Sequence, residues 1–154
     1  HEVRGMAGGV LVVDDFAHHP TAVRETLAAI KEFGLPGWGP GAGRLVAAFE
    51  PRSNTSRRNV FQADYARAFA AADLIFLREP PGMEATPEAE RLSSARLAAD
   101  LQARGQNARA FGDGDALLAA LLAELRPGDL CLAMSNGGFD DLHARLLAGL
   151  AERA

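Results

Sequence analysis

The sequence contains one lysine and one cysteine among its 154 residues, and each scarcity excludes some chemistry. The lone Cys131 cannot close an internal disulfide, and its apolar neighbours indicate a buried, inert thiol. Lys31 falls in a predicted helix, so any reaction that needs a lysine elsewhere in this chain is excluded. The remaining Lys and Arg positions are all arginines, which suit two-point contacts to carboxylates or phosphates.

Long apolar runs, a signal sequence and an excess of basic charge are also missing. No apolar stretch approaches the roughly 18–20 residues of a membrane span, and no signal-peptide pattern opens the chain, so a cytoplasmic location is expected. Sixteen basic and 20 acidic residues give a net charge of −4, which offers no general attraction for nucleic acid or anionic lipid. The length suits one domain, and the start at His1 without methionine suggests a piece of a longer protein.

What the sequence does contain is an alternation of short apolar runs and longer helical stretches. The runs are unbroken, which is typical of parallel strands covered on both faces. We therefore predict a three-layer α/β/α sandwich around a mostly parallel, Rossmann-like sheet. The predicted strands are 9–13, 45–49, 73–77, 108–111 and 129–134, with 3–6 as an added edge strand. The predicted helices are 21–33 capped by Thr21, 60–72, 88–104, 115–125 and a last one ending near residue 152.

Polar side chains gather where the predicted strands end. Asp14 and Asp15 follow the first buried strand, Glu50 follows the second and Arg78 the third. Because ligands of such sheets bind beyond the carboxyl ends of the strands, we predict a site at this rim. Ordinary loop polarity and a metal site built from Asp and His are the alternatives for the segment 14–20. Neither a Gly-x-x-x-x-Gly-Lys-Ser/Thr loop nor a Gly-x-Gly-x-x-Gly turn is present, so the chain alone does not cradle a triphosphate.

Two loops at the same rim are candidates for anion binding. Residues 52–58 hold three arginines among small polar side chains, which makes either an anion clamp or a solvated basic loop. Residues 135–138 form either a backbone nest for phosphate or carboxylate, or a tight strand-to-helix turn that needs glycine. A receiver domain is excluded despite the Asp14–Asp15 pair, because Glu50 ends the next buried strand and the only lysine is Lys31.

Residues 14–20, Asp-Asp-Phe-Ala-His-His-Pro, resemble the Asp-Asp-(Tyr/Phe)-(Gly/Ala)-His-x-Pro signature of the C-terminal domain of Mur ligases. These are the ATP-dependent amide ligases of peptidoglycan synthesis. The segments 2–5, 49–55 and 134–139 are similar to those of the murein peptide ligases of this family. Such enzymes join UDP-N-acetylmuramate to L-alanyl-γ-D-glutamyl-meso-diaminopimelate in peptidoglycan recycling. Muramate–alanine ligases usually carry a His-Arg-Tyr-Thr-Arg-like segment where residues 52–56 stand.

The resemblance implies that residues 1–154 form a single domain, the third of a three-domain ligase. The UDP-sugar domain and the central ATPase domain, which holds most contacts to ATP and magnesium, are absent from this chain, so the chain alone is predicted to be inactive. Asp15 would bind the ribose of ATP, Phe16 would pack near the nucleotide, and His18 would face the phosphates or the incoming peptide as the catalytic candidate. The residues implied for the peptide pocket are Arg52, Ser53, Asn54, Thr55, Arg57, Arg58, Asn136 and Gly137.

The implied partners are UDP-N-acetylmuramate, the murein tripeptide and the two missing domains, without nucleic acid, membrane or a metal held by this chain. Three other hypotheses stay open at this point. In the first hypothesis, the chain is the C-terminal domain of a UDP-N-acetylmuramate–L-alanine ligase. In the second, it is a freestanding module that binds a nucleotide or peptide without catalysis. In the third, it is a subunit that assembles with separate partner chains.

Overall fold

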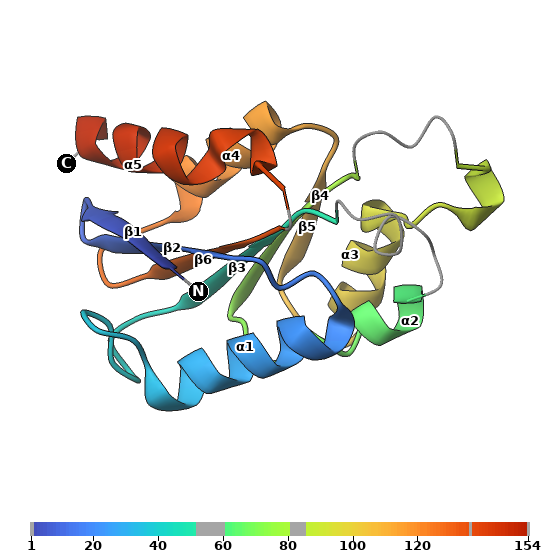
Figure 1. The fold of residues 1–154 in the computed structure, drawn as a ribbon, viewed down its shortest axis with the longest axis horizontal. Helices are drawn as coiled ribbons and strands as arrows, with labels where there is room; N and C mark the ends of the chain where they lie inside the picture. The colour runs from blue at the N-terminus through green and yellow to red at the C-terminus, as the bar shows by residue number, and fades with distance from the viewer. Residues whose placement is uncertain (1, 52–60, 81–85, 136, 154) are drawn as a thin grey trace.

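The computed structural model describes residues 2–51, 61–80, 86–135 and 137–153. Its centre is a six-stranded sheet with the order β1-β2-β6-β3-β4-β5 (Figure 1). The strands are β1 (Glu2–Ala7), β2 (Val10–Asp15), β3 (Leu45–Phe49), β4 (Leu74–Arg78), β5 (Ala108–Phe111) and β6 (Leu130–Met134). Only the β1–β2 pair is antiparallel among them, so the predicted edge strand and the mostly parallel sheet are confirmed.

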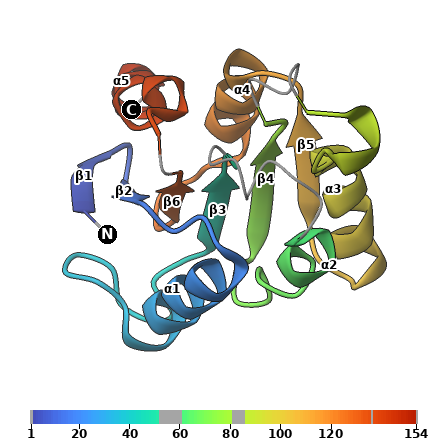
Figure 2. The same ribbon diagram turned by 45° about the vertical axis from the view of Figure 1, so that its right-hand side comes forward.

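Helices cover both faces of this sheet, as the two ribbon views show (Figures 1 and 2). On one face lie α1 (Pro20–Phe33), α2 (Gln62–Tyr65) and α3 (Ser94–Ala103). On the other lie α4 (Gly114–Glu124) and α5 (Leu142–Arg153), the latter packed over β1 and β2. The predicted three-layer α/β/α sandwich is therefore confirmed.

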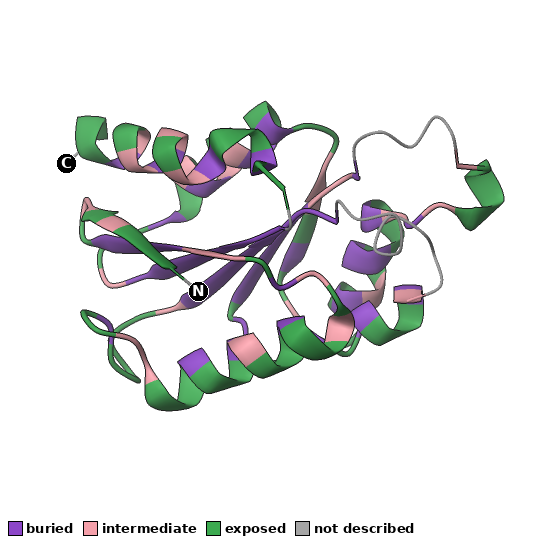
Figure 3. Cartoon of the chain, in the orientation of Figure 1, coloured by how far each residue is buried: buried purple, intermediate pink, exposed green. Residues whose placement is uncertain are grey.

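The unbroken apolar runs reflect two separate cores. Successive side chains of a strand point to opposite faces, so Leu11 and Val13 enter the core under α1 to α3. Val10 and Val12 enter the core under α4 and α5. Figure 3 shows the result, with buried strands between helices whose outer faces are exposed. No helix within the described part of the chain is long and apolar enough to cross a membrane.

Two of the predicted helices are wrong in extent. In the described part of the predicted helix 60–72, which begins at residue 61, only Gln62–Tyr65 is α-helical. The aromatic rings of Tyr65 and Phe69 both pack against Phe49, with centroids 5.2 and 5.6 Å away, so core packing bends the segment into turns. Packing overrides helical spacing here because burial of large rings outweighs local propensity.

The predicted helix 88–104 is divided in the same way. A short 3₁₀ turn at Glu88–Glu90 ends before the fully buried Leu92, and α3 then begins at Ser94. The Ser93 side chain caps α3 by accepting the Arg96 N–H at 3.1 Å. The predicted cap of α1 is also wrong, because the helix begins at Pro20 itself, where proline's fixed φ and missing N–H suit the first turn.

Candidate functional site at the carboxyl ends of the strands

The rim beyond the carboxyl ends of β2, β6, β3 and β4 collects the polar side chains that the sequence analysis singled out. At the end of β2, Asp14 and Asp15 point to opposite sides of the strand, as neighbours on a strand must. Asp14 accepts a hydrogen bond from the Arg4 side chain of β1 at 2.9 Å, so the neighbouring strand binds its carboxylate. Asp15 therefore carries the carboxylate that β2 presents on the other side.

Asp15 is positioned by the turn that follows it. Its Oδ2 accepts the N–H of Ala17 at 2.9 Å, and its backbone carbonyl accepts the N–H of Ser135 at 3.0 Å. A cavity of about 240 Å³ beside it is lined in part by Asp14, Asp15 and Phe16. Phe16 as a residue is 76% exposed, which is unusual for a large apolar side chain. The Asp15 carboxylate can accept hydrogen bonds from a diol. The exposed Phe16 ring beside it can stack on a flat heterocycle.

His18 is fixed from two sides. Its Nδ1 lies 2.8 Å from the carbonyl oxygen of Phe16, and because a carbonyl only accepts, Nδ1 carries the proton. This leaves Nε2 as the atom that can accept a proton or a hydrogen bond. The buried Tyr65 hydroxyl donates to the carbonyl of His18 and ties the turn to α2. His19 is exposed and its ring meets the edge of Phe61, with centroids 5.5 Å apart.

A buried polar network joins the ends of β3, β4 and β6. Glu50 has no exposed surface, and the Ser135 hydroxyl donates to its Oε1 at 2.9 Å. The Arg78 Nε lies 3.5 Å from the other carboxylate oxygen, Oε2, and also donates to Asp140 Oδ2 at 3.0 Å. The sequence pattern places Glu50 and Arg78 at the rim but indicates no role for either residue. The polar residues at the ends of three strands are visible in the sequence. The strand order that brings these residues together is not.

The turn after β6 belongs to the same network. Gly137 is exposed, and its N–H donates to the Ser135 hydroxyl at 3.1 Å. Farther along, Phe139, Asp140 and Asp141 all have positive φ, between 48° and 54°. Three such residues in a row store backbone strain, which is typical of functional turns. The contact of Arg78 with Asp140 stabilises this turn in its place.

Glu79 adds a half-buried carboxylate after β4. Burial raises the pKa of Glu79, and hydrogen bonds from the backbone N–H groups of Ser94 and Ala95 oppose that rise. The carboxylate thus lies at the N-terminus of α3, where the helix dipole favours negative charge.

The turn that holds Asp15, Phe16 and His18 and the turn that holds Gly137 follow neighbouring strands, because β2 and β6 pair up to Asp15 and Met134. The remaining predicted peptide-pocket residues lie outside the described residues: Arg52, Ser53, Asn54, Thr55, Arg57, Arg58 and Asn136. Within the described ranges, no three His, Cys, Asp or Glu side chains converge in a way that would hold a metal ion.

The family model for the glutamate ligase domain of Mur ligases matches residues 1–137, so the chain belongs to this family. It is 41% identical over 153 residues to the UDP-N-acetylmuramate–L-alanyl-γ-D-glutamyl-meso-2,6-diaminoheptandioate ligase of Escherichia coli K12, covering 99% of this chain and 30% of that protein. It is 36% identical over 157 residues to the UDP-N-acetylmuramate–L-alanine ligase of Symbiobacterium thermophilum, covering 99% and 30%.

A solved structure supports the same assignment. A domain from a protein named as a UDP-N-acetylmuramate:L-alanyl-γ-D-glutamyl-meso-diaminopimelate ligase of Haemophilus ducreyi superposes with a TM-score of 0.69 at 29% identity. The match covers 97% of this chain and 98% of that one. The chain therefore spans about 30% of the length of the curated relatives that it matches, and nearly all of a domain solved by itself.

Proposed function

We propose that this chain is the C-terminal domain of an ATP-dependent ligase that joins UDP-N-acetylmuramate to L-alanyl-γ-D-glutamyl-meso-diaminopimelate in peptidoglycan recycling. The observation that carries the proposal is the 41% identity, along 99% of the chain, to the E. coli ligase named for this substrate pair. The second candidate is an L-alanine ligase domain, which the 36% identity to the S. thermophilum enzyme favours. Both candidates belong to the same family and predict the same fold.

The rim at the end of β2 would serve the nucleotide. A carboxylate at a strand end accepts hydrogen bonds from the two ribose hydroxyls of a nucleotide, and Asp15 occupies such a position. The exposed Phe16 ring would lie against the base. His18, with its proton on Nδ1, presents Nε2 to the phosphates or to the attacking amine, which makes it our candidate for proton transfer.

The rim beyond β3 and β6 would serve the peptide. Arginines bind carboxylates through paired N–H donors, so Arg57 and Arg58 suit the acidic groups of a D-glutamyl peptide. Gly137 exposes backbone beside Ser135, where a peptide group can approach closely. The set that we assign to this part of the site is Arg52, Ser53, Asn54, Thr55, Arg57, Arg58, Asn136 and Gly137.

In the reaction, ATP phosphorylates the muramate carboxylate, the peptide amine attacks the acyl phosphate, and the tetrahedral intermediate releases phosphate as the amide forms. Charge develops on the phosphoryl oxygens and on the carbonyl oxygen, and positioned arginines stabilise it. This chain would hold the nucleotide and the peptide in line, which is a contribution of orientation and closure.

Magnesium and the triphosphate cradle belong to a different part of the enzyme under this proposal. The described residues supply no cluster that fits a magnesium ion, and the sequence has no P-loop. We therefore infer that the isolated chain turns over no ATP and that a central domain in the same polypeptide supplies these parts. UDP-sugars and ATP are cytoplasmic pools, so we place the enzyme there.

Two experiments test the proposal. An antibody against this domain should detect a polypeptide several times heavier than 16.3 kDa in source cells, whereas a band at 16.3 kDa would support a freestanding module. The complete enzyme should release ADP only when UDP-N-acetylmuramate and a peptide acceptor are both present. The isolated chain is the matched control and should release none.

A further inference from the structure

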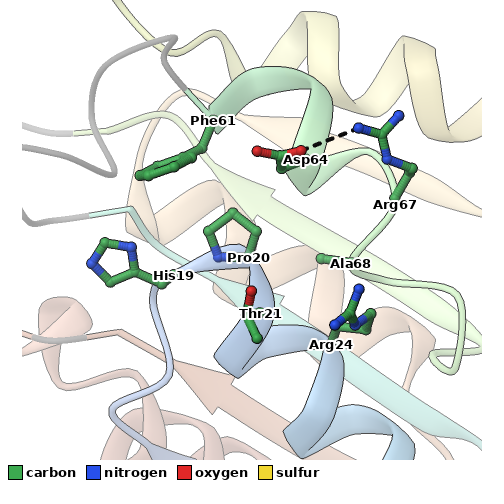
Figure 4. Close-up of a pocket in the computed structure, with 8 residues that line it drawn as sticks. All are labelled: His19, Pro20, Thr21, Arg24, Phe61, Asp64, Arg67 and Ala68. Atoms are coloured by element: carbon green, nitrogen blue, oxygen red, sulfur yellow. Dashed lines mark hydrogen bonds and ion pairs between the residues drawn. The ribbon is translucent and has the colours of Figure 1, made fainter.

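A cavity between α1 and α2 has no part in the function proposed so far. It has a volume of about 340 Å³, within the range of small-ligand sites. Figure 4 shows His19 and Phe61 on one side of it and the two guanidinium groups on the other. The residues that matter for its chemistry are His19, Arg24, Phe61, Asp64, Arg67 and Ala68.

The charges around this cavity are of both signs. Arg67 and Asp64 form an ion pair, Nη2 to Oδ1, at 3.1 Å across one turn. Arg24 has neither a hydrogen bond nor an ion pair with any residue in the described part of the chain, and its side chain is exposed. An arginine that lines a cavity and pairs with no described carboxylate of the protein is available for a ligand carboxylate.

The mixture of charges limits the class of ligand. The Asp64 carboxylate repels a ligand that carries only negative charge, such as a phosphate, and an apolar ligand would leave the Arg24 guanidinium without a partner. A group that carries a carboxylate and an ammonium on one carbon matches the lining, because Arg24 can pair with the first and Asp64 with the second. Phe61 and Ala68 supply apolar surface for a short alkyl chain.

We infer that this cavity binds the free amino-acid end of the diaminoheptanedioate residue, the end that is not linked to D-glutamate. This inference rests on the proposed function, since it assumes a peptide with that residue. The cavity begins at His19, whose ring centroid lies 4.8 Å from that of His18. Arg24 lies five residues farther, about 7.5 Å along the helix. An extended tripeptide spans roughly 10 Å, so a peptide whose amine lies at the rim reaches the cavity.

The cavity would therefore distinguish the peptide from L-alanine. L-Alanine carries no second amino-acid end, and a ligase of that specificity gains nothing from Arg24 or Asp64. Arg24 and Asp64 would bind different groups of the third residue of the tripeptide. Arg24 would sense its free carboxylate, and Asp64 would sense its free ammonium.

The test uses the complete enzyme and three tripeptides that differ only in the third residue: meso-diaminopimelate, L-lysine and L-alanine. Lysine keeps the ammonium and lacks the carboxylate, whereas alanine lacks both. We expect Arg24→Ala to raise KM for the diaminopimelate peptide about tenfold, with kcat within about twofold and little change for the other two peptides. We expect Asp64→Asn to raise KM for the diaminopimelate and lysine peptides together.

The control is Arg104→Ala, which removes an exposed arginine on the far end of α3 and should change none of the three KM values. The inference is overturned if Arg24→Ala changes KM equally for all three peptides, or changes none of them, while the unmodified enzyme ligates the diaminopimelate peptide. If the unmodified enzyme ligates no tripeptide, the proposed function is wrong and the inference falls with it. Unchanged melting temperatures for the variants confirm that the fold is intact.

Discussion

Arg78 lies against the fully buried carboxylate of Glu50, with its Nε 3.5 Å from Glu50 Oε2. The two residues end neighbouring strands, β3 and β4, that are separated by the whole α2 region in the sequence. Ser135, at the end of β6, donates to the other oxygen of the same carboxylate. One buried acid thereby links the ends of three strands beneath the proposed substrate rim.

Removing Arg78 should therefore cost stability as well as order at the rim. We expect Arg78→Ala to lower the free energy of unfolding by about 3 kcal/mol, because it removes a positive charge that lies 3.5 Å from a fully buried carboxylate. Urea unfolding of the isolated chain measures this change. Arg104→Ala is the control and should shift the midpoint only slightly, since its side chain is exposed. A loss of under 1 kcal/mol for Arg78→Ala would contradict this account of the network.

A second ion pair, at the opposite end of the sheet, predicts how stability depends on pH. Burial of Asp129 tends to raise its pKa, but hydrogen bonds from the Arg44 side chain and the Arg126 N–H outweigh this and lower the pKa. Arg44 contacts both oxygens, Nε to Oδ1 at 3.0 Å and Nη2 to Oδ2 at 2.7 Å. A carboxyl whose pKa is lower in the folded state stabilises the fold above its unfolded pKa, about 4, and loses that contribution as pH falls through the folded value.

The expected outcome is a gap between the unmodified chain and Asp129→Asn that depends on pH. At pH 6 to 7 the variant should be less stable by about 2–4 kcal/mol, since it loses a buried charge partner of Arg44. Below pH 4 the gap should narrow, because protonation removes the same charge from the unmodified chain. Thermal unfolding between pH 3 and pH 7 measures both curves, and a constant gap over that range would refute the assignment.

The thiol of Cys131 should be inert in the folded chain. Burial, and to a lesser degree the charge of Asp129, raises the pKa of this thiol to about 12. The reactive thiolate is therefore scarce at pH 8, and the side chain is fully buried in β6. We expect a thiol-specific reagent to label none of the native protein within minutes and one thiol per chain after unfolding. Labelling of the native state at the rate of a free cysteine would contradict the burial described here.

Asp15 carries the proposed contact to the nucleotide. We expect Asp15→Ala in the complete enzyme to raise KM for ATP about tenfold, because a charge-assisted hydrogen bond to the ribose is lost. The KM for the peptide should change little. Steady-state kinetics at saturating peptide measure the effect, and Glu152→Ala is the matched control, since Glu152 is an exposed acid near the end of α5. Unchanged ATP kinetics would remove Asp15 from the nucleotide site.

Arg52 carries the proposed contact to the peptide. We expect Arg52→Ala to raise KM for the tripeptide by about tenfold or more and to leave KM for ATP within about twofold. The two constants come from one kinetic series in which each substrate is varied in turn. Equal increases in both constants would show that Arg52 does not belong to the peptide pocket.

Much of the fold was predictable because the central strands β2, β3, β4 and β6 are built on unbroken apolar runs with polar residues at or just after their ends. Strands 45–49 and 108–111 have the predicted bounds. The helical predictions failed where burial of Tyr65, Phe69 and Leu92 overrode helical spacing. The local sequence pattern indicates helix propensity. It does not indicate the tertiary packing that replaces part of a helix with a turn.

The site was predictable only in part, for a related reason. The Asp15 and His18 positions follow from one contiguous motif after β2, and the structure places both at the predicted rim. The link between Glu50, Arg78 and Ser135 depends on β6 and β4 lying on either side of β3. That order is a property of the whole sheet and is not encoded in any single segment.

The most direct measurement of the central claim is the ratio of two specificity constants. For the complete enzyme with ATP and UDP-N-acetylmuramate, kcat/KM should be compared for L-alanyl-γ-D-glutamyl-meso-diaminopimelate and for L-alanine. Our account predicts that the tripeptide is preferred by at least about a hundredfold, as two additional charged contacts would give. A preference for L-alanine would instead make this chain the domain of an alanine ligase and would contradict the substrate that we propose.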